Sequence, residues 1–396
     1  MLRLSVKLSV ITLAAFFFSG CGGGSNSSST DPDPDPTPDP TPDPIDVVDP
    51  LGPIGSFSEE QAQFFDALLV DFIAPGYVNA AAGMQALDAE FESFCSSSNQ
   101  DDSALRLAWL EAMAAWQAIQ WVDFGPITTI NPPNLVLQLP ARMRIQFFPD
   151  ENGAVEPNVN AQLNSDAALT QDFIAVQPVG AQGLPALEFM IFDLELFQSG
   201  AGDQRACELA NAVSGNLVVI FDQLAEAWGA GGETNNEFST LTGVFADTEV
   251  LLQVVFESLV FHAEFVADAK LLDGINGTFE SFESWRSESS LNNIQVNFAT
   301  LNNIYTNGDA YGLTDLLFRA FGSSLADDEF MENIANIEAD IAALDGSLEA
   351  VRQSEEASGL ALIESIETGA QSIAEALNFA AEEANVNVGF NLSDGD

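Results

Sequence analysis

Apolar side chains recur every three or four residues along most of the chain after residue 57, and this spacing restricts the fold more than any other feature. Within residues 58–73 the repeating positions are Phe65, Leu68, Leu69 and Phe72. Ser58 and Gln61 have the spacing of a helix-capping box at the start of that segment. Residues 247–273 form a longer, mostly apolar run, which predicts a helix at the centre of a bundle. Only NLVLQLP, residues 134–140, has the character of a strand, so we predict an all-α fold built from helix bundles.

The first 56 residues have a different character and are excluded from the predicted fold. Residues 1–20 carry two basic residues, an apolar stretch and small residues before Cys21, which is typical of a secretory signal. FFSGC resembles a bacterial lipobox, in which the cysteine is lipidated; the alternative is an ordinary signal cleaved nearby. Residues 21–56 are rich in Gly and Ser and then in Asp-Pro repeats, which predicts a disordered, partly extended tether.

The chain is strongly acidic, and this charge excludes several partners. It has 60 Asp and Glu against 10 Lys and Arg, for a formal net charge of −50. After the signal, Lys270 is the only lysine. Such a charge repels nucleic acid and anionic lipid, so we expect no nucleic-acid partner. We interpret the acidity as an adaptation for solubility at high salt rather than as a device for collecting cations.

Two cysteines remain after Cys21, namely Cys95 and Cys207. In an exported chain, two cysteines indicate one disulfide, and two buried free thiols are the alternative.

One short motif suggests a site. QGLPALEFMIF, residues 182–192, places Gly183, Pro185 and Glu188 at the start of an apolar helix. A carboxylate there is favoured by the helix dipole and free backbone N–H groups, and we prefer this structural role for Glu188 over a metal-ligand role. Asp150, in DENG, is a second weak metal candidate that a plain turn explains equally well. His262, the only histidine, lies among apolar residues and is expected to be a packed helix residue.

Four segments in order resemble the imelysin-like family, also known as peptidase M75. They are residues 108–127, 144–153, 182–192 and 285–305. The resemblance implies one helical domain over residues 57–396 made of two packed bundle halves, with a boundary near 230–245. It also implies pairing of Cys95 with Cys207. Family members are exported, often lipoproteins, and often associated with iron-regulated uptake.

The family motif is Gly-x-His-x-x-Glu, proposed to bind metal, and in this chain Pro185 occupies the histidine position. Proline offers a metal no side-chain donor, so only Glu188 of the pair remains. The sequence therefore favours a non-catalytic binding or accessory protein linked to iron or metal uptake. A metallopeptidase and an envelope interaction scaffold remain alternatives. The ligand implied by the resemblance is iron or another divalent cation, although nothing in the sequence requires a cofactor.

The same resemblance and the lipobox predict the location. We expect an exported protein, anchored through a lipid on Cys21 to the outer membrane and facing the periplasm, with a metal ion or an envelope protein as its further partner. Gly22, rather than Asp, follows the cysteine, which is consistent with that membrane.

Replacing Cys21 tests the anchor. Cys21→Ser should release the protein in soluble form into the periplasm, because no acyl chain would hold it to the membrane. The measurement is the fraction of protein that partitions into detergent. If the variant still partitions with membranes as the parent chain does, the anchor lies elsewhere.

Overall fold

The computed structural model describes residue 51 and residues 54–97, 101–130, 140–150, 153–193, 204–323 and 325–389. Residues Asp49–Asp396 form one compact unit. The described residues contain helices and turns but no strand, which confirms the all-α prediction. The signal, Cys21 and most of the tether lie outside the described residues, as do residues 134–139 of the expected strand.

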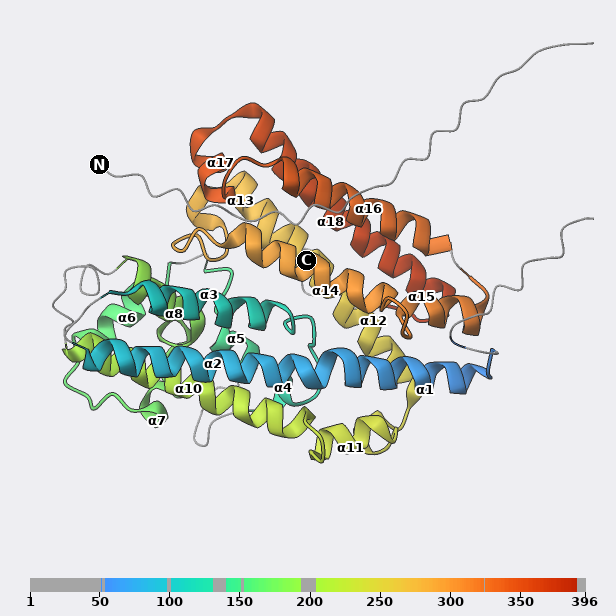
Figure 1. The fold of residues 1–396 in the computed structure, drawn as a ribbon, viewed down its shortest axis with the longest axis horizontal. Helices are drawn as coiled ribbons and strands as arrows, with labels where there is room; N and C mark the ends of the chain where they lie inside the picture. Colours follow the sequence, from blue (N-terminus) through green and yellow to red (C-terminus); the bar gives the residue numbers. More distant parts are fainter. Residues whose placement is uncertain are drawn as a thin grey trace, which may run out of the picture. The chain divides into compact units, whose positions relative to one another are not determined.

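One set of helices packs around α2 and α10 (Figure 1). In chain order its elements are α1 Phe57–Ala67, η1 Leu68–Ile73, α2 Ala74–Ser96, α3 Ser103–Gln117, α4 Pro126–Thr129, α5 Ala141–Ile145, α6 Val155–Leu163, α7 Gln171–Ile174, η2 Val179–Ala181, α8 Gly183–Glu188, η3 Phe189–Asp193, α10 Gln204–Trp228, α11 Glu233–Ser239 and η4 Gly243–Phe245. The long helices α2 and α10 lie side by side, and α3 packs on α2.

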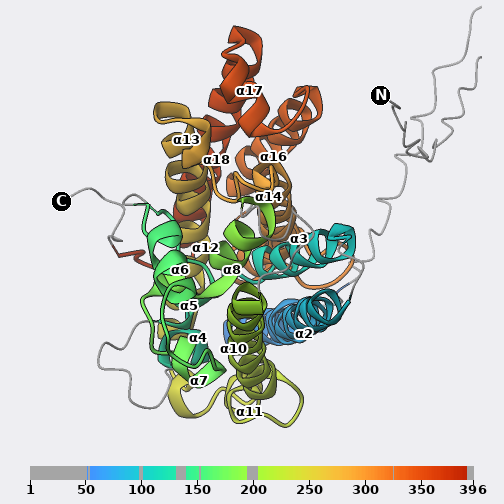
Figure 2. The same cartoon turned by 90° about the vertical axis from the view of Figure 1, so that its left-hand side faces the viewer.

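A second set packs around α18. Its elements are α12 Thr248–Phe265, η5 Val266–Leu272, α13 Asp273–Asn276, η6 Phe279–Ser281, α14 Ser290–Thr306, α15 Leu313–Leu316, η7 Leu317–Phe321, α16 Leu325–Ala343, α17 Leu348–Ser354 and α18 Ala357–Glu383. Helices α16 and α12 contact α18, and α14 contacts both α16 and α3. In both views α2, α10 and α11 of the first set lie in the lower part of the picture, and α13, α16 and α17 of the second set lie in the upper part (Figures 1 and 2).

The core is made by the apolar stripes that the periodicity predicted. Trp109 and Trp116 of α3 and Trp228 of α10 are almost completely buried. Helix α12 and the π-helical η5 that continues it bury most of their apolar residues against α18 and α14. The central position predicted for residues 247–273 is therefore confirmed.

The first helix begins two residues earlier than the sequence indicated. Its capping box pairs Ser56 with Glu59 rather than Ser58 with Gln61. The Ser56 backbone N–H and hydroxyl each donate to Glu59 Oε2 at 2.7 Å. The reason is that Phe57 packs edge-on against Phe321 and is already helical, so the cap must precede it.

A disulfide joins Cys95 at the end of α2 to Cys207 near the start of α10, with Cα atoms 5.8 Å apart. The paired-cysteine prediction is confirmed. Because α2 and α10 are the two helices at the centre of the first set, the bond fixes their relative position at one end.

Removing this bond should destabilise the fold. It closes a loop with a sequence separation of 112 residues. The chain-entropy model for such a loop gives a loss of about 4–5 kcal/mol in unfolding free energy for Cys95→Ala/Cys207→Ala. Denaturant unfolding measures the loss, and the reduced parent protein serves as the matched control. Equal stability of the oxidised and reduced parent would contradict this expectation.

Candidate functional site

The start of α8 depends on Gly183 and Pro185. Gly183 has φ +75°, and a Cβ there would lie 2.3 Å from the carbonyl oxygen of Ile145. Only glycine therefore fits where the start of α8 packs against the end of α5. Pro185 is the third residue of α8, where its missing N–H would have no partner inside the helix. Trp109 Nε1 donates to the Leu184 carbonyl at 3.1 Å, which fixes α8 against α3.

Glu188 is the last residue of α8, and its carboxylate is held from another part of the chain. Its Oε1 accepts hydrogen bonds from the backbone N–H of Ser287 at 2.9 Å and from the Ser287 hydroxyl at 2.8 Å. The expected role, a carboxylate satisfied by the free N–H groups of its own helix, is wrong. Glu188 lies a full turn beyond those groups, and the chain widens into the π-helical η3 directly after it. Such π-helical turns are frequent at functional sites.

The surroundings of Glu188 favour its protonated form. Burial raises its pKa from 4.5 to about 7, while the hydrogen bonds from Ser287 and the charge of Arg286 oppose that rise. Only 3 % of the residue is exposed. Glu188 is therefore a group that changes charge near neutral pH.

Ser287 belongs to a tight loop, residues 282–289, which precedes α14. Ser284 and Glu288 have left-handed φ values of 59° and 55°, an uncommon conformation for residues with a side chain. The Ser287 hydroxyl oxygen also lies 2.9 Å from the Ser284 carbonyl oxygen, so its single proton is shared between that oxygen and Glu188. The backbone strain at two positions within five residues is offset by these contacts, so the loop presents its side chains in one arrangement.

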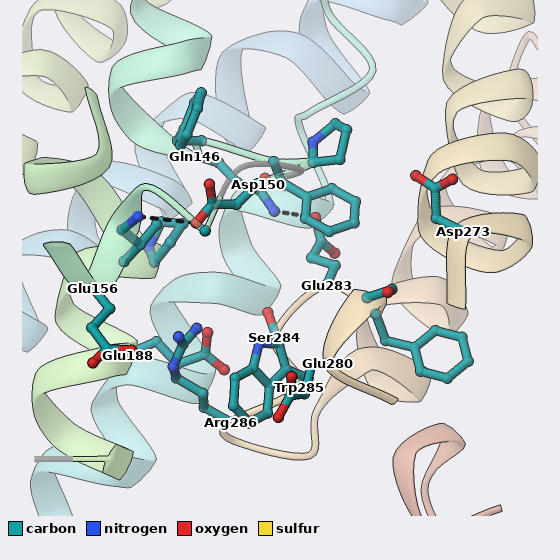
Figure 3. A pocket seen from close by; sticks show the side chains of 18 of the residues that line it. Gln146, Asp150, Glu156, Glu188, Asp273, Glu280, Glu283, Ser284, Trp285 and Arg286 are labelled. Atoms are coloured by element: carbon teal, nitrogen blue, oxygen red, sulfur yellow. Dashed lines mark hydrogen bonds between the residues drawn. The ribbon is translucent and has the colours of Figure 1, made fainter. Parts of the chain in front are cut away.

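A cavity of about 590 Å³ lies between this loop and the segments around α8 (Figure 3). Seven of its lining residues are carboxylic acids and one, Arg286, is basic. Besides Glu188, the acids are Asp150, Glu156, Asp193, Asp273, Glu280 and Glu283. The cavity therefore brings together the two metal candidates of the sequence, Glu188 and Asp150, and also Pro185.

Arg286 spans part of this cavity. Its Nε donates to Asp193 Oδ2 at 2.8 Å, and its guanidinium lies 4.3 Å from the ring centre of Trp285 and 5.3 Å from that of Phe189. The contact joins the 282–289 loop to η3. Arg286 is thus paired with Asp193, and its charge also acts on Glu188, whose pKa it lowers.

Asp150 has a structural role in this arrangement. Its two carboxylate oxygens accept the backbone N–H groups of Ala154 and Val155, at 2.6 and 3.0 Å, and so organise the start of α6. Among the described residues, no group of three or more His, Cys, Asp or Glu side chains lies close enough to hold a metal ion. Since Pro185 also lacks a donor atom, the residues present do not fit a resident transition metal of the kind proposed for the family motif.

Beneath the cavity lies a buried polar network centred on Lys270 and Glu283. Lys270 Nζ lies 3.3 Å from Glu283 Oε2 and donates to Asn297 Oδ1 at 2.8 Å. It also donates to Gln117 and Gln120, at 2.5 and 2.7 Å. Burial lowers the pKa of Lys270 to about 8, and Glu283 opposes that fall.

Glu283 also lines the cavity, as does its hydrogen-bond donor Gln146. Gln146 and Asn293 donate to its two oxygens, the latter at 3.0 Å. The sequence analysis missed Lys270 and Glu283 as site residues. The only lysine after residue 20, within a mostly apolar helix, was the signal that could have indicated Lys270. Glu283 had no local signal.

His262 lies in α12 and is fully buried, as predicted for a packed residue. Burial holds its pKa well below the usual value. Neither ring nitrogen has a hydrogen-bond partner in the described part of the chain. It does not line the cavity.

The pKa of Glu188 gives a pH-dependent stability. Between pH 4.5 and 7 the native state binds this proton more strongly than the unfolded state, so stability falls as pH rises through that window, by about 3 kcal/mol in total. Glu188→Gln keeps an oxygen for Ser287 but cannot titrate, so the variant should lack this part of the pH dependence. Chemical denaturation at several pH values measures the difference. Glu338→Gln, an exposed change in α16, is the matched control. Parallel curves for the parent and Glu188→Gln would contradict the assignment.

Comparison with known proteins was consistent with the fold. An imelysin-like protein from Psychrobacter arcticum 273-4 superposes with a TM-score of 0.69 at 20% identity, over 85% of this chain and 99% of the other. A protein from Parabacteroides distasonis ATCC 8503, described as an iron-regulated protein A precursor, gives a TM-score of 0.64 at 15% identity, over 84% of this chain and 96% of the other. A search of curated protein sequences finds no significant match.

The family model of imelysin matches residues 73–376, which covers α2 through most of α18. This span includes the cavity and the network beneath it. The chain therefore belongs to the imelysin family.

Proposed function

We propose that this protein is an exported, lipid-anchored and non-catalytic binding protein of the cell envelope, whose ligand is a cation taken up by the cell. The observation that carries the proposal is the cavity at Glu188, in which carboxylates outnumber basic side chains seven to one. A concave site with polar groups at defined places is where a small ligand is expected to bind. The lipobox at Cys21 supports the anchored location.

The chemistry of the cavity favours binding over catalysis. A metallopeptidase needs about three protein ligands and an activated water on the metal. Here Pro185 stands in place of the family histidine, and both oxygens of Asp150 accept backbone N–H groups. The remaining acid of the motif, Glu188, is hydrogen-bonded to Ser287.

A connection with iron or another metal rests on the family and on the relative from Parabacteroides distasonis that is described as iron-regulated. In this chain the cavity offers a bare transition metal mainly oxygen donors, whereas borderline metals prefer nitrogen or sulfur ligands. The two cysteines that could have supplied sulfur are joined in the disulfide. We therefore propose that metal binding at the cavity is weak and sensitive to salt. The protein would then act as an accessory to metal uptake and not as a high-affinity metal carrier.

Restoring the histidine tests this reading of the site. The parent protein should bind zinc or ferrous ion only weakly at high salt. Pro185→His should gain stoichiometric binding, because position 185 lines the cavity together with Glu188 and the two are three residues apart on one helix. Titration followed by elemental analysis measures the gain, with Pro185→Ala as the matched control. Sub-micromolar binding by the parent that Glu188→Ala abolishes would overturn this reading of the motif, although a cation-binding function would stand.

A further inference from the structure

We propose that the ligand of this cavity is an elongated organic cation with two or more ammonium groups, that is, a compound of the polyamine class. The inference rests on the proposed function, because it names the cation that the cavity binds. It follows from the way charge is distributed in the cavity rather than from the amount of charge.

The first observation is that the carboxylates are spread over the cavity instead of converging on a point. Glu188 and Glu283 are buried at its floor, whereas Glu156, Asp273 and Glu280 are exposed at its rim. Figure 3 shows Glu156 on the opposite side of the cavity from Asp273. No described cluster of three donors could surround a single ion. Negative charges at different depths of the cavity match a ligand whose positive charges are separated along a chain.

The second observation is an unused acceptor at the floor. Both hydrogen bonds to Glu188 end on Oε1. Within the described residues no hydrogen bond ends on Oε2, and Glu188 is 3 % exposed. Because Glu188 lines the cavity, Oε2 is available to a ligand that enters it. An ammonium group that enters the cavity can donate a charge-assisted hydrogen bond to this oxygen.

The other floor carboxylate does not compete for the ligand. Glu283 is paired with Lys270 and receives hydrogen bonds from Gln146, Gln117 and Asn293. At the rim, Asp193 is similarly neutralised by Arg286. The attraction therefore comes from Glu188 inside and from the acids at the rim. Two of these, Glu156 and Glu280, have no partner within the described ranges.

The third observation is that apolar side chains form part of the cavity wall. Met113, Phe147, Phe148, Pro149 and Phe282 contribute to the lining. A hydrated metal ion gains nothing from such a wall, whereas the methylene chain between two ammonium groups buries apolar surface against it. The volume of about 590 Å³ lies in the range of small-molecule sites and exceeds what one ion requires.

Isothermal titration of the purified protein at pH 8 tests the proposal. At this pH Glu188 is mainly ionised, since its pKa is about 7. The probes are spermidine, 1,4-diaminobutane, butylamine, ferrous ion and zinc. Each is titrated at about 0.15 M sodium chloride, which is near physiological ionic strength, and at about 0.5 M, where screening is stronger. Binding that survives the higher salt is binding at the site rather than attraction to the acidic surface. We expect one spermidine per chain to remain bound at the higher salt, with butylamine about tenfold weaker or more, because one charge-assisted hydrogen bond of this type contributes about that factor.

Variants locate the two ends of the ligand. Glu188→Gln should weaken spermidine and butylamine alike, by about tenfold or more. Glu156→Gln/Glu280→Gln should weaken spermidine and 1,4-diaminobutane but leave butylamine unchanged, because only a second ammonium group reaches the rim. Glu338→Gln, which removes one exposed carboxylate from α16, should change nothing.

The outcomes separate this inference from the proposed function. Spermidine binding no stronger than that of butylamine, or binding that no cavity variant affects, overturns the polyamine assignment. If ferrous ion or zinc binds in a manner that depends on Glu188 while the amines do not, the assignment fails but a cation-binding function stands. If no probe shows binding that depends on Glu188, both the polyamine assignment and the cation-binding function are wrong.

Discussion

The arrangement of the whole site depends on one buried ion pair, between Lys270 and Glu283. Both side chains are almost completely buried, so each charge has lost its hydration. An unpaired charge in that position would cost several kcal/mol by the usual estimates. The polar side chains around it, Gln117, Gln120 and Asn297, satisfy the remaining donors and acceptors.

This network comes from four separated parts of the chain. Gln117 ends α3, Lys270 lies in η5, Asn297 lies in α14 and Glu283 is the second residue of the 282–289 loop. A buried polar network is satisfied only when all its members are in register, and it therefore selects one relative position of the elements that carry them. The loop that follows Glu283 also supplies Arg286 and Ser287 to the cavity, so the geometry of the cavity follows from the geometry of the network.

The chain has the fold of its family, and the motif that the resemblance singled out here serves packing as well as the cavity. Gly183 makes a close approach to Ile145, Glu188 lines the cavity, and Pro185 serves the helix start. A shared fold does not carry a shared function, because function depends on the side chains of the site. Among the described residues, the separation of the carboxylates is the property that distinguishes this cavity from a metal centre.

The sequence by itself determined the helical class, the apolar stripes, the central place of residues 247–273 and the pairing of Cys95 with Cys207. These follow from local periodicity and from a count of cysteines, both of which can be read along the chain. It also singled out Glu188 but gave its carboxylate the wrong partner. Tertiary structure alone decided that Ser287, 99 residues away, holds Glu188, and that Lys270 meets Glu283. Contacts between distant segments, and the burial that shifts a pKa, arise only when the helices pack, and no local pattern encodes them.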